Sequence, residues 1–180
     1  MAFDPAKPAD HAALDSQVMR DQLTALKALI DAQGTLAYGR LAADWTSASS
    51  SFSDVAGLSF AVGAGENWTA EIVLHAISSA TGQGFKFRVA GPGAGSVMIA
   101  IAGTGTSTST SIDCEVQTAF SMASPAKTFC SGSNITGVIR IHIVVFNATA
   151  GTVQLQANNS GGSNTVTLKA NSDLVARRTS

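Results

Sequence analysis

The sequence predicts a mainly β protein: a jelly-roll-like antiparallel β-sandwich preceded by a short N-terminal α-helix. Three observations predict this fold. Beyond residue 45, apolar side chains recur at every second position in short runs, which is the period of a strand with one buried face. Turns rich in glycine, such as Gly82-Gln-Gly84 and Ser160-Gly-Gly162, separate these runs. Only residues 10–33 combine helical spacing with an interior free of glycine and proline.

Residues 10–33 are expected to form one helix of about 36 Å, with Asp10 as its N-cap and Gly34 as its stop. Four apolar positions follow the 4-3-4 spacing of a coiled-coil seam: Met19, Leu23, Leu26 and Ile30. The helix either packs on its own domain or associates with copies of the chain, and we favour association because an N-terminal stripe has little else to contact. At about two heptads the seam is too short to hold a trimer alone. Residues 1–34 are therefore expected to be an anchor or trimerisation segment, and residues 35–180 the head domain.

Roughly nine or ten strands are expected in the head, among them residues 58–62, 68–76, 85–89, 97–101, 114–120, 137–146, 152–157, 165–168 and 174–176. In the fifth of these, the alternation assigns one face to Cys114, Val116, Thr118 and Phe120. Residues 35–44 are a transition, and the low-complexity stretch 103–111 is expected to be a flexible loop. Cys114 and Cys130 are expected to be reduced core residues, since a disulfide would need an oxidising compartment and no export signal is recognised.

The second face of two strands is not purely polar. In the strand at 137–146, Val144 and Phe146 accompany Arg140 and His142, whereas a solvated face is expected to carry polar residues throughout. The strand at 68–76 repeats the pattern with Val73. The candidate subunit interface is therefore Glu71, Val73, His75, Arg140, His142, Val144 and Phe146.

The composition points away from nucleic acid and towards self-association. The formal net charge is −1, so no electrostatic attraction to nucleic acid or anionic lipid is expected, and no apolar run is long enough to insert into a membrane. Charged residues make up 13% of the chain, about half the usual share. A surface with so few charges repels neighbours weakly, so copies of the chain or a partner are expected to cover much of it.

The residues offer little for catalysis or cofactor binding. No Gly-x-Ser-x-Gly elbow occurs, and a carboxylate pair of Glu71 with Glu115 or Asp113 has nothing in its spacing to favour it. As a functional pair, His75 and His142 would bind a metal on a symmetry axis or sense pH, but a hydrogen-bonding or interface role beside Glu71 and Arg140 is favoured. The chain is expected to be no enzyme and to carry no cofactor and no metal.

Two parts of the chain resemble tailed-phage virion proteins. Residues 3–10 (Phe-Asp-Pro-Ala-Lys-Pro-Ala-Asp) and 20–31 resemble the N-terminal segment of such proteins. Residues 45–178 resemble the jelly-roll heads of trimeric fibre and capsid-decoration proteins, through Gly65-Glu-Asn-Trp68, the strand at 137–146 with 149–155, and the closing 168–172 and 176–178.

The resemblance implies a homotrimeric component of a phage particle, assembled in the host cytoplasm, that is either a capsid decoration or head fibre or a short tail fibre. Its N-terminus would attach to another capsid or tail protein and its head would project outward. The family supplies no active-site residue. The alternative function is a carbohydrate- or receptor-binding module for host attachment, for which Tyr38 or Trp45 would be the aromatic contact.

Overall fold

The computed structural model of the chain describes residues 16–32, 34–80, 82–92, 96–104, 112–122, 125, 127–132, 136–146 and 148–179. The chain divides into two compact units, Met1–Thr35 and Leu36–Ser180.

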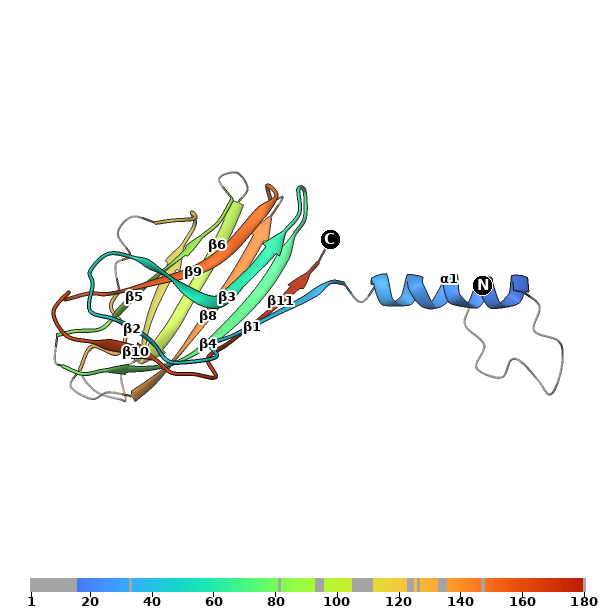
Figure 1. Cartoon of the computed structure of the whole chain (residues 1–180). Helices are drawn as coiled ribbons and strands as arrows, with labels where there is room; N and C mark the ends of the chain where they lie inside the picture. Colours follow the sequence, from blue (N-terminus) through green and yellow to red (C-terminus); the bar gives the residue numbers. More distant parts are fainter. Residues whose placement is uncertain are drawn as a thin grey trace. The chain divides into compact units, whose positions relative to one another are not determined.

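The first unit contains the helix α1, Ser16–Ala32 (Figure 1). The helix is confirmed over these residues, while the expected cap Asp10 and residues 11–15 lie outside the described part. Gly34 has a φ of +77°, the left-handed conformation in which a helix commonly ends and which glycine adopts without a steric penalty. The end of the helix therefore lies where the sequence predicts it.

The second unit is a β-sandwich, as predicted. Its strands are β1 Leu36–Arg40, β2 Trp45–Ser47, β3 Ser53–Val62, β4 Trp68–Ser78, β5 Phe85–Ala90, β6 Ser96–Thr104, β7 Ile112–Gln117, β8 Thr136–Phe146, β9 Gly151–Asn159, β10 Val166–Leu168 and β11 Asp173–Arg178. The transition after the helix differs from expectation, because it forms β1, which pairs with β11. Residues 103 and 104 also differ, because they complete β6 instead of beginning a loop.

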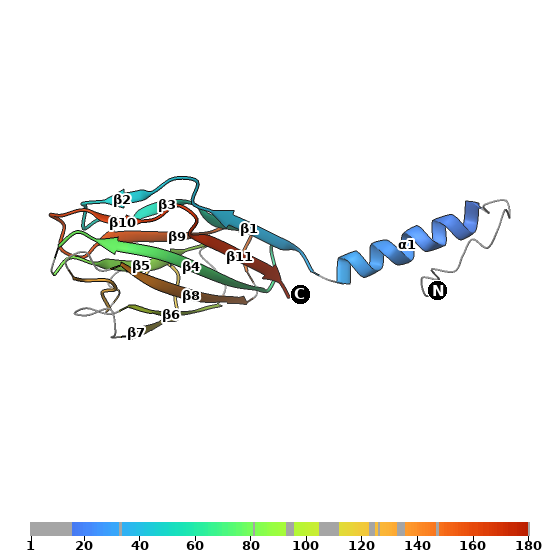
Figure 2. The ribbon, with the colours of Figure 1, turned by 90° about the horizontal axis from the view of Figure 1, so that it is seen from below.

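The strands form two antiparallel sheets. The large sheet has the order β1-β11-β4-β8-β6-β7, with β10 pairing β4 and β2 pairing β10; Figure 2 shows its strands in this order. The small sheet has the order β3-β9-β5. The strands β3 to β6 alternate between the two sheets, and so do β8, β9 and β10, which is the wound connectivity of a jelly-roll-like sandwich.

The core lies between the inner faces of the two sheets. The alternating side chains predicted to face inward are buried in β3, β4, β5, β6 and β8, including Trp68 at 3% exposure. Phe87 is central, because its ring lies 5.5 Å from that of Phe85 and 6.1 Å from that of Phe129. Full burial of a side chain of this size stabilises the folded chain by roughly 1.5–3 kcal/mol. Because many inward side chains of the alternating strands are buried in this way, their burial is a major contribution to the stability of the sandwich.

The strand β7 is turned over relative to the prediction. Glu115 and Gln117 are buried between the sheets, whereas Cys114 and Val116 are exposed. The reason is that the inward polar groups find partners: Gln117 Nε2 donates to the carbonyl oxygen of Phe87 at 2.9 Å, and Glu115 Oε2 accepts from the Lys127 backbone N–H at 3.1 Å. The expectation that Cys114 is a core residue is therefore wrong, while Cys130 is a buried free thiol, as expected.

Candidate functional site

The outer face of the large sheet is the surface that turns away from the core. Antiparallel partners in register share a face, so successive strands contribute neighbouring side chains. One row across six strands consists of Tyr38, Val175, Glu71, His142, Ala100 and Val116. The next row consists of Arg40, Asp173, Val73, Arg140, Ala102 and Cys114. This surface is called the outer face below.

The outer face carries most of the exposed large hydrophobic side chains of the described residues. Eight lie on it: Leu36, Tyr38, Met98, Ile112, Val116, Val138, Phe146 and Val175. The other four lie on α1: Val18, Met19, Leu23 and Leu26. Among the described residues the small sheet and the loops expose none of this class. Scattered apolar side chains are ordinary on a protein surface, but their gathering on one sheet face and one helix makes these two surfaces the candidates for an interaction site.

The outward side of the small sheet is polar by contrast. Its side chains satisfy one another across the strands: Gln156 Oε1 accepts from Arg88 Nε at 2.7 Å, and Gln156 Nε2 donates to Asp54 at 2.7 Å. Gln154 Nε2 donates to the Val55 carbonyl oxygen at 3.0 Å. The sandwich is thus two-sided, with one hydrated surface and one surface rich in apolar groups.

The residues predicted as a subunit interface lie together on the outer face. Glu71, Val73 and His75 lie on β4 and the other four, Arg140, His142, Val144 and Phe146, on the neighbouring β8. In register, Glu71 is opposite His142 and Val73 is opposite Arg140. His75 and His142 are both exposed. They do not lie opposite each other in the pairing of β4 with β8, because the residue opposite His75 is Val138.

Charged side chains on the outer face pair with one another at the surface. Arg140 Nη1 lies 3.1 Å from Glu71 Oε1, with both side chains more than half exposed. An exposed ion pair of this kind contributes about 0–1 kcal/mol, and a partner surface can cover it with its hydrogen bond intact. Arg40 donates to Asn171 Oδ1 at the edge of the sheet.

Sequence reasoning missed most of the apolar part of this surface. It found β8 and β4 because apolar residues there follow charged ones, but it did not include Met98 on β6 or Val175 on β11. It also missed Leu36 and Tyr38, whose alternation in a five-residue segment was the available signal.

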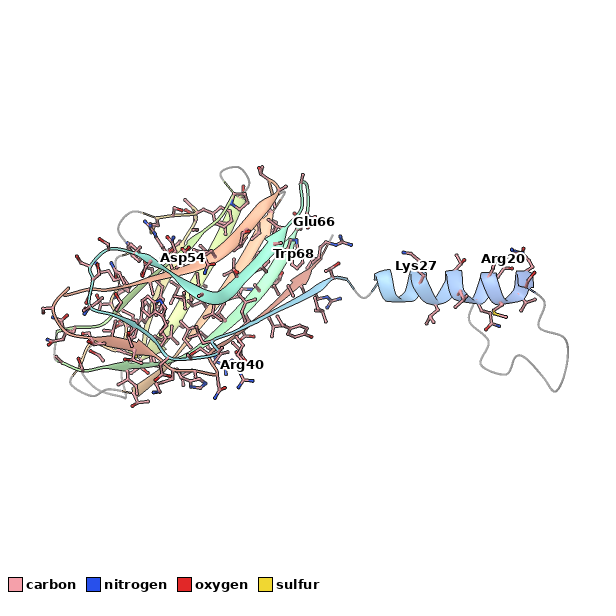
Figure 3. The ribbon with its side chains drawn as sticks, in the orientation of Figure 1. Arg20, Lys27, Arg40, Asp54, Glu66 and Trp68 are labelled. Atoms are coloured by element: carbon pink, nitrogen blue, oxygen red, sulfur yellow. The ribbon has the colours of Figure 1, made fainter. Side chains whose placement is uncertain are left out.

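The helical seam is exposed in the described part of α1. Met19, Leu23 and Leu26 are 43%, 59% and 44% exposed, and the side chain of Ile30 lies outside the described residues. On the same helix, Gln17 Nε2 donates to Asp21 at 2.9 Å and Arg20 donates to Gln17 at 3.1 Å. Figure 3 shows the side chains of Arg20 and Lys27 on this helix.

The structure does not bring Glu71 together with Glu115 as a carboxylate pair. Glu71 lies on the outer face, whereas Glu115 is buried between the sheets, so the large sheet separates them. Asp113 pairs with Lys127 at 3.6 Å. Within the described residues no group of three or more histidine, cysteine or acidic side chains is placed to hold a metal ion. None of the described helices has the length and apolar character that crossing a membrane requires.

Three groups have shifted pKa values, each with a local cause. The backbone N–H of Gly63, followed by Trp68 and Arg178, lowers the pKa of Glu66. The hydrogen bond from Lys169, followed by the backbone N–H of Ala170, lowers the pKa of Asp44. Burial raises the pKa of the Cys130 thiol to about 11, so this thiol is protonated and unreactive at neutral pH.

Comparisons of the chain with family models, with curated proteins and with solved structures find no match.

Proposed function

We propose that this chain is a non-enzymatic structural protein that assembles with copies of itself as a homotrimer. The observation that carries the proposal is the distribution of exposed large hydrophobic side chains, which gather on the outer face and on α1. Exposed apolar and aromatic side chains of this kind are typical of the centre of a subunit interface. The low overall charge of the chain supports the same proposal, since it weakens the repulsion between copies.

The energy available on the outer face supports stable association. Its large hydrophobic side chains range from 42% exposed at Val175 to 78% exposed at Ile112, so burial in an interface still removes apolar area from water. At roughly 25 cal/mol per Å² of apolar area, several such side chains together offset the entropy lost on association, which is several kcal/mol. The helix adds a second contact, since the exposed seam is too short to hold copies together alone.

The resemblance to trimeric phage proteins supplies the number of copies and the setting. We propose that the trimer is a component of a tailed-phage particle, a capsid decoration or head fibre or a short tail fibre. Residues 1–34 would attach it and the sandwich would project outward. The position and copy number of the chain in a purified particle test this setting.

Sedimentation of the full chain tests the assembly itself. We expect one species with three times the 18.3 kDa mass of a single chain, persisting at micromolar concentration. A stable monomer at that concentration would contradict the proposal. A dimer would keep the self-association but contradict the trimer.

A further inference from the structure

The outward side of the small sheet contains a hollow of about 410 Å³ beside β5. Phe52 and the hydroxyl-bearing Ser50 and Ser51 form one part of its wall, Lys86 and Arg88 from β5 form another, and Asn158 from β9 also lines it. Lys86 and Arg88 point the same way because they are two residues apart on one strand. The hollow lies on the opposite sheet from the outer face.

Arg88 is held in place by neutral groups. The carbon at the centre of its guanidinium lies 4.4 Å from the centroid of the Phe52 ring, a cation–π contact. Its Nε donates to Gln156 Oε1 at 2.7 Å, and Gln156 in turn donates to Asp54 at 2.7 Å. Within the described residues the two terminal nitrogens of Arg88 have no partner, so they are free to donate to a ligand.

Lys86 adds a second positive charge to the same wall. Neither Lys86 nor Arg88 makes an ion pair with a carboxylate in the described part of the chain, whereas Arg140 on β8 pairs with Glu71 and Arg178 on β11 pairs with Glu66. Two unpaired cations in a concave site attract an anion, and a guanidinium with two free nitrogens suits a planar carboxylate.

The uncharged residues that line the hollow determine which kind of anion fits it. Phe52 and Pro125 are the apolar residues of the lining, whereas Ser50 and Ser51 are lining residues that carry hydroxyl groups. A bare phosphate or acetate would use the cations alone, but a sugar acid would use all three kinds of group. We propose that this hollow binds an acidic sugar unit of a polysaccharide, a hexuronic or sialic acid, with its carboxylate on Arg88 and Lys86. The volume lies within the range of small-molecule pockets.

This inference gives a location and a ligand class to the host-attachment function weighed from the sequence, and it does not depend on the trimer. A monomer that binds sugar acids would contradict only the assembly, whereas a trimer that does not bind them would contradict only this inference.

Saturation-transfer NMR on the full chain tests the proposal with four probes: D-glucuronate, N-acetylneuraminate, D-glucose and sodium acetate. We expect transfer to one or both sugar acids at millimolar concentration and none to glucose. Lys86→Gln should weaken binding about tenfold, the usual effect of a charge-assisted hydrogen bond, and leave the Arg88–Phe52 contact in place. Arg88→Gln should weaken it at least as much.

Arg177→Gln on the large sheet is the matched control, because it removes the same charge from an exposed position far from the hollow. Binding by this control should equal that of the unchanged chain, and thermal melting should show that all three variants are folded. Equal binding by acetate would reduce the site to a general anion site and overturn the sugar assignment. No transfer to either sugar acid, or equal binding by all variants, would overturn the proposal as a whole.

Discussion

At the residue scale, Glu66 joins more structural features than any sequence motif indicated. Its Oε2 accepts from the Gly63 backbone N–H at 2.6 Å and from Trp68 Nε1 at 2.9 Å, while its Oε1 lies 3.0 Å from Arg178 Nη1. Figure 3 labels Glu66 beside Trp68. The carboxylate therefore ties the turn between β3 and β4 to the end of β11.

We predict that Glu66→Gln lowers the melting temperature near neutral pH, because the amide loses the charge that all three donors favour. The pKa of Glu66 is lowered in the folded chain, so its stabilisation is fully present above its ordinary value of 4.5 and is lost as pH falls through the folded pKa. The deficit of the variant, a few degrees at neutral pH, should therefore shrink in acid. Thermal melting followed by circular dichroism at several pH values measures this.

Glu71→Gln is the control for this prediction, since Glu71 pairs with Arg140 on an exposed surface. It should change the melting temperature less than Glu66→Gln at neutral pH. A Glu66→Gln deficit that is equally large at neutral and acid pH would contradict the linkage to the carboxylate charge.

The two cysteines lie in different environments, although both were predicted from the sequence to be core residues. Cys130 is fully buried and its thiol pKa is raised to about 11, whereas Cys114 is exposed on β7. We predict that a thiol reagent labels Cys114→Ser only after unfolding, whereas it labels Cys130→Ser in the folded chain once the copies are dissociated. Mass spectrometry of the labelled proteins measures this, and rapid labelling of folded Cys114→Ser would contradict the burial of Cys130.

At the scale of elements, the sequence predicted those strands whose buried face is apolar throughout. From Trp68 to Ala76 in β4 and from Ile139 to Val145 in β8 the inward positions are all apolar, so the period of two decides the face. The same rule failed for β7, where apolar Val116 faces out and Gln117 faces in. A hydrogen bond from Gln117 to the Phe87 carbonyl oxygen decides that face, and a partner 30 residues away leaves no local pattern.

The sequence likewise predicted only part of the outer face. The alternation located its centre on β4 and β8, but the pairing of β1 and β11 at one edge, and of β6 and β7 at the other, depends on topology. The hollow beside β5 was not predictable, since it depends on the position of Phe52 against a strand more than 30 residues later.

The helix α1 makes a separate prediction. Replacing Leu23 and Leu26 by aspartate places charges in the seam and should weaken association of the full chain, because buried unpaired charges are costly. Thr24→Asp with Ala28→Asp is the matched control: it adds the same charges at exposed positions off the seam, so it should associate normally. Sedimentation over a concentration series compares the two. Equal association of both double variants would show that the helix is no part of the assembly.

At the scale of the whole molecule, the two surfaces of the sandwich differ in chemistry, and the assembly proposal assigns them different tasks. The outward side of the small sheet has internally satisfied polar groups and remains in water, where its hollow is accessible. The outer face has exposed Met98 and Val175 beside charged side chains such as Glu71 and Arg140, and burial between copies would remove the apolar groups from water. One sandwich can therefore serve assembly with one sheet and recognition with the other.

We predict that Met98→Asp or Val175→Asp dissociates the trimer without unfolding the sandwich. Both side chains are about half exposed in the single chain, so the folded monomer tolerates a carboxylate there, whereas an interface would bury it without a partner. Because every subunit carries the substitution, each contact between copies is weakened, and the losses in the free energy of association add up over the trimer. Sedimentation should show the monomer mass, and far-ultraviolet circular dichroism should be unchanged.

Thr152→Asp is the matched control, because Thr152 is exposed on β9 of the small sheet and lies outside the proposed interface. It should sediment as the unchanged chain does. Labelling of Cys114 gives a second, independent measurement: on the outer face beside Ala102, this thiol should be protected in the trimer and reactive in the dissociated variants. If Met98→Asp and Val175→Asp both sediment as trimers with Cys114 reactive throughout, then copies associate through another surface and the outer face is left exposed in the assembly.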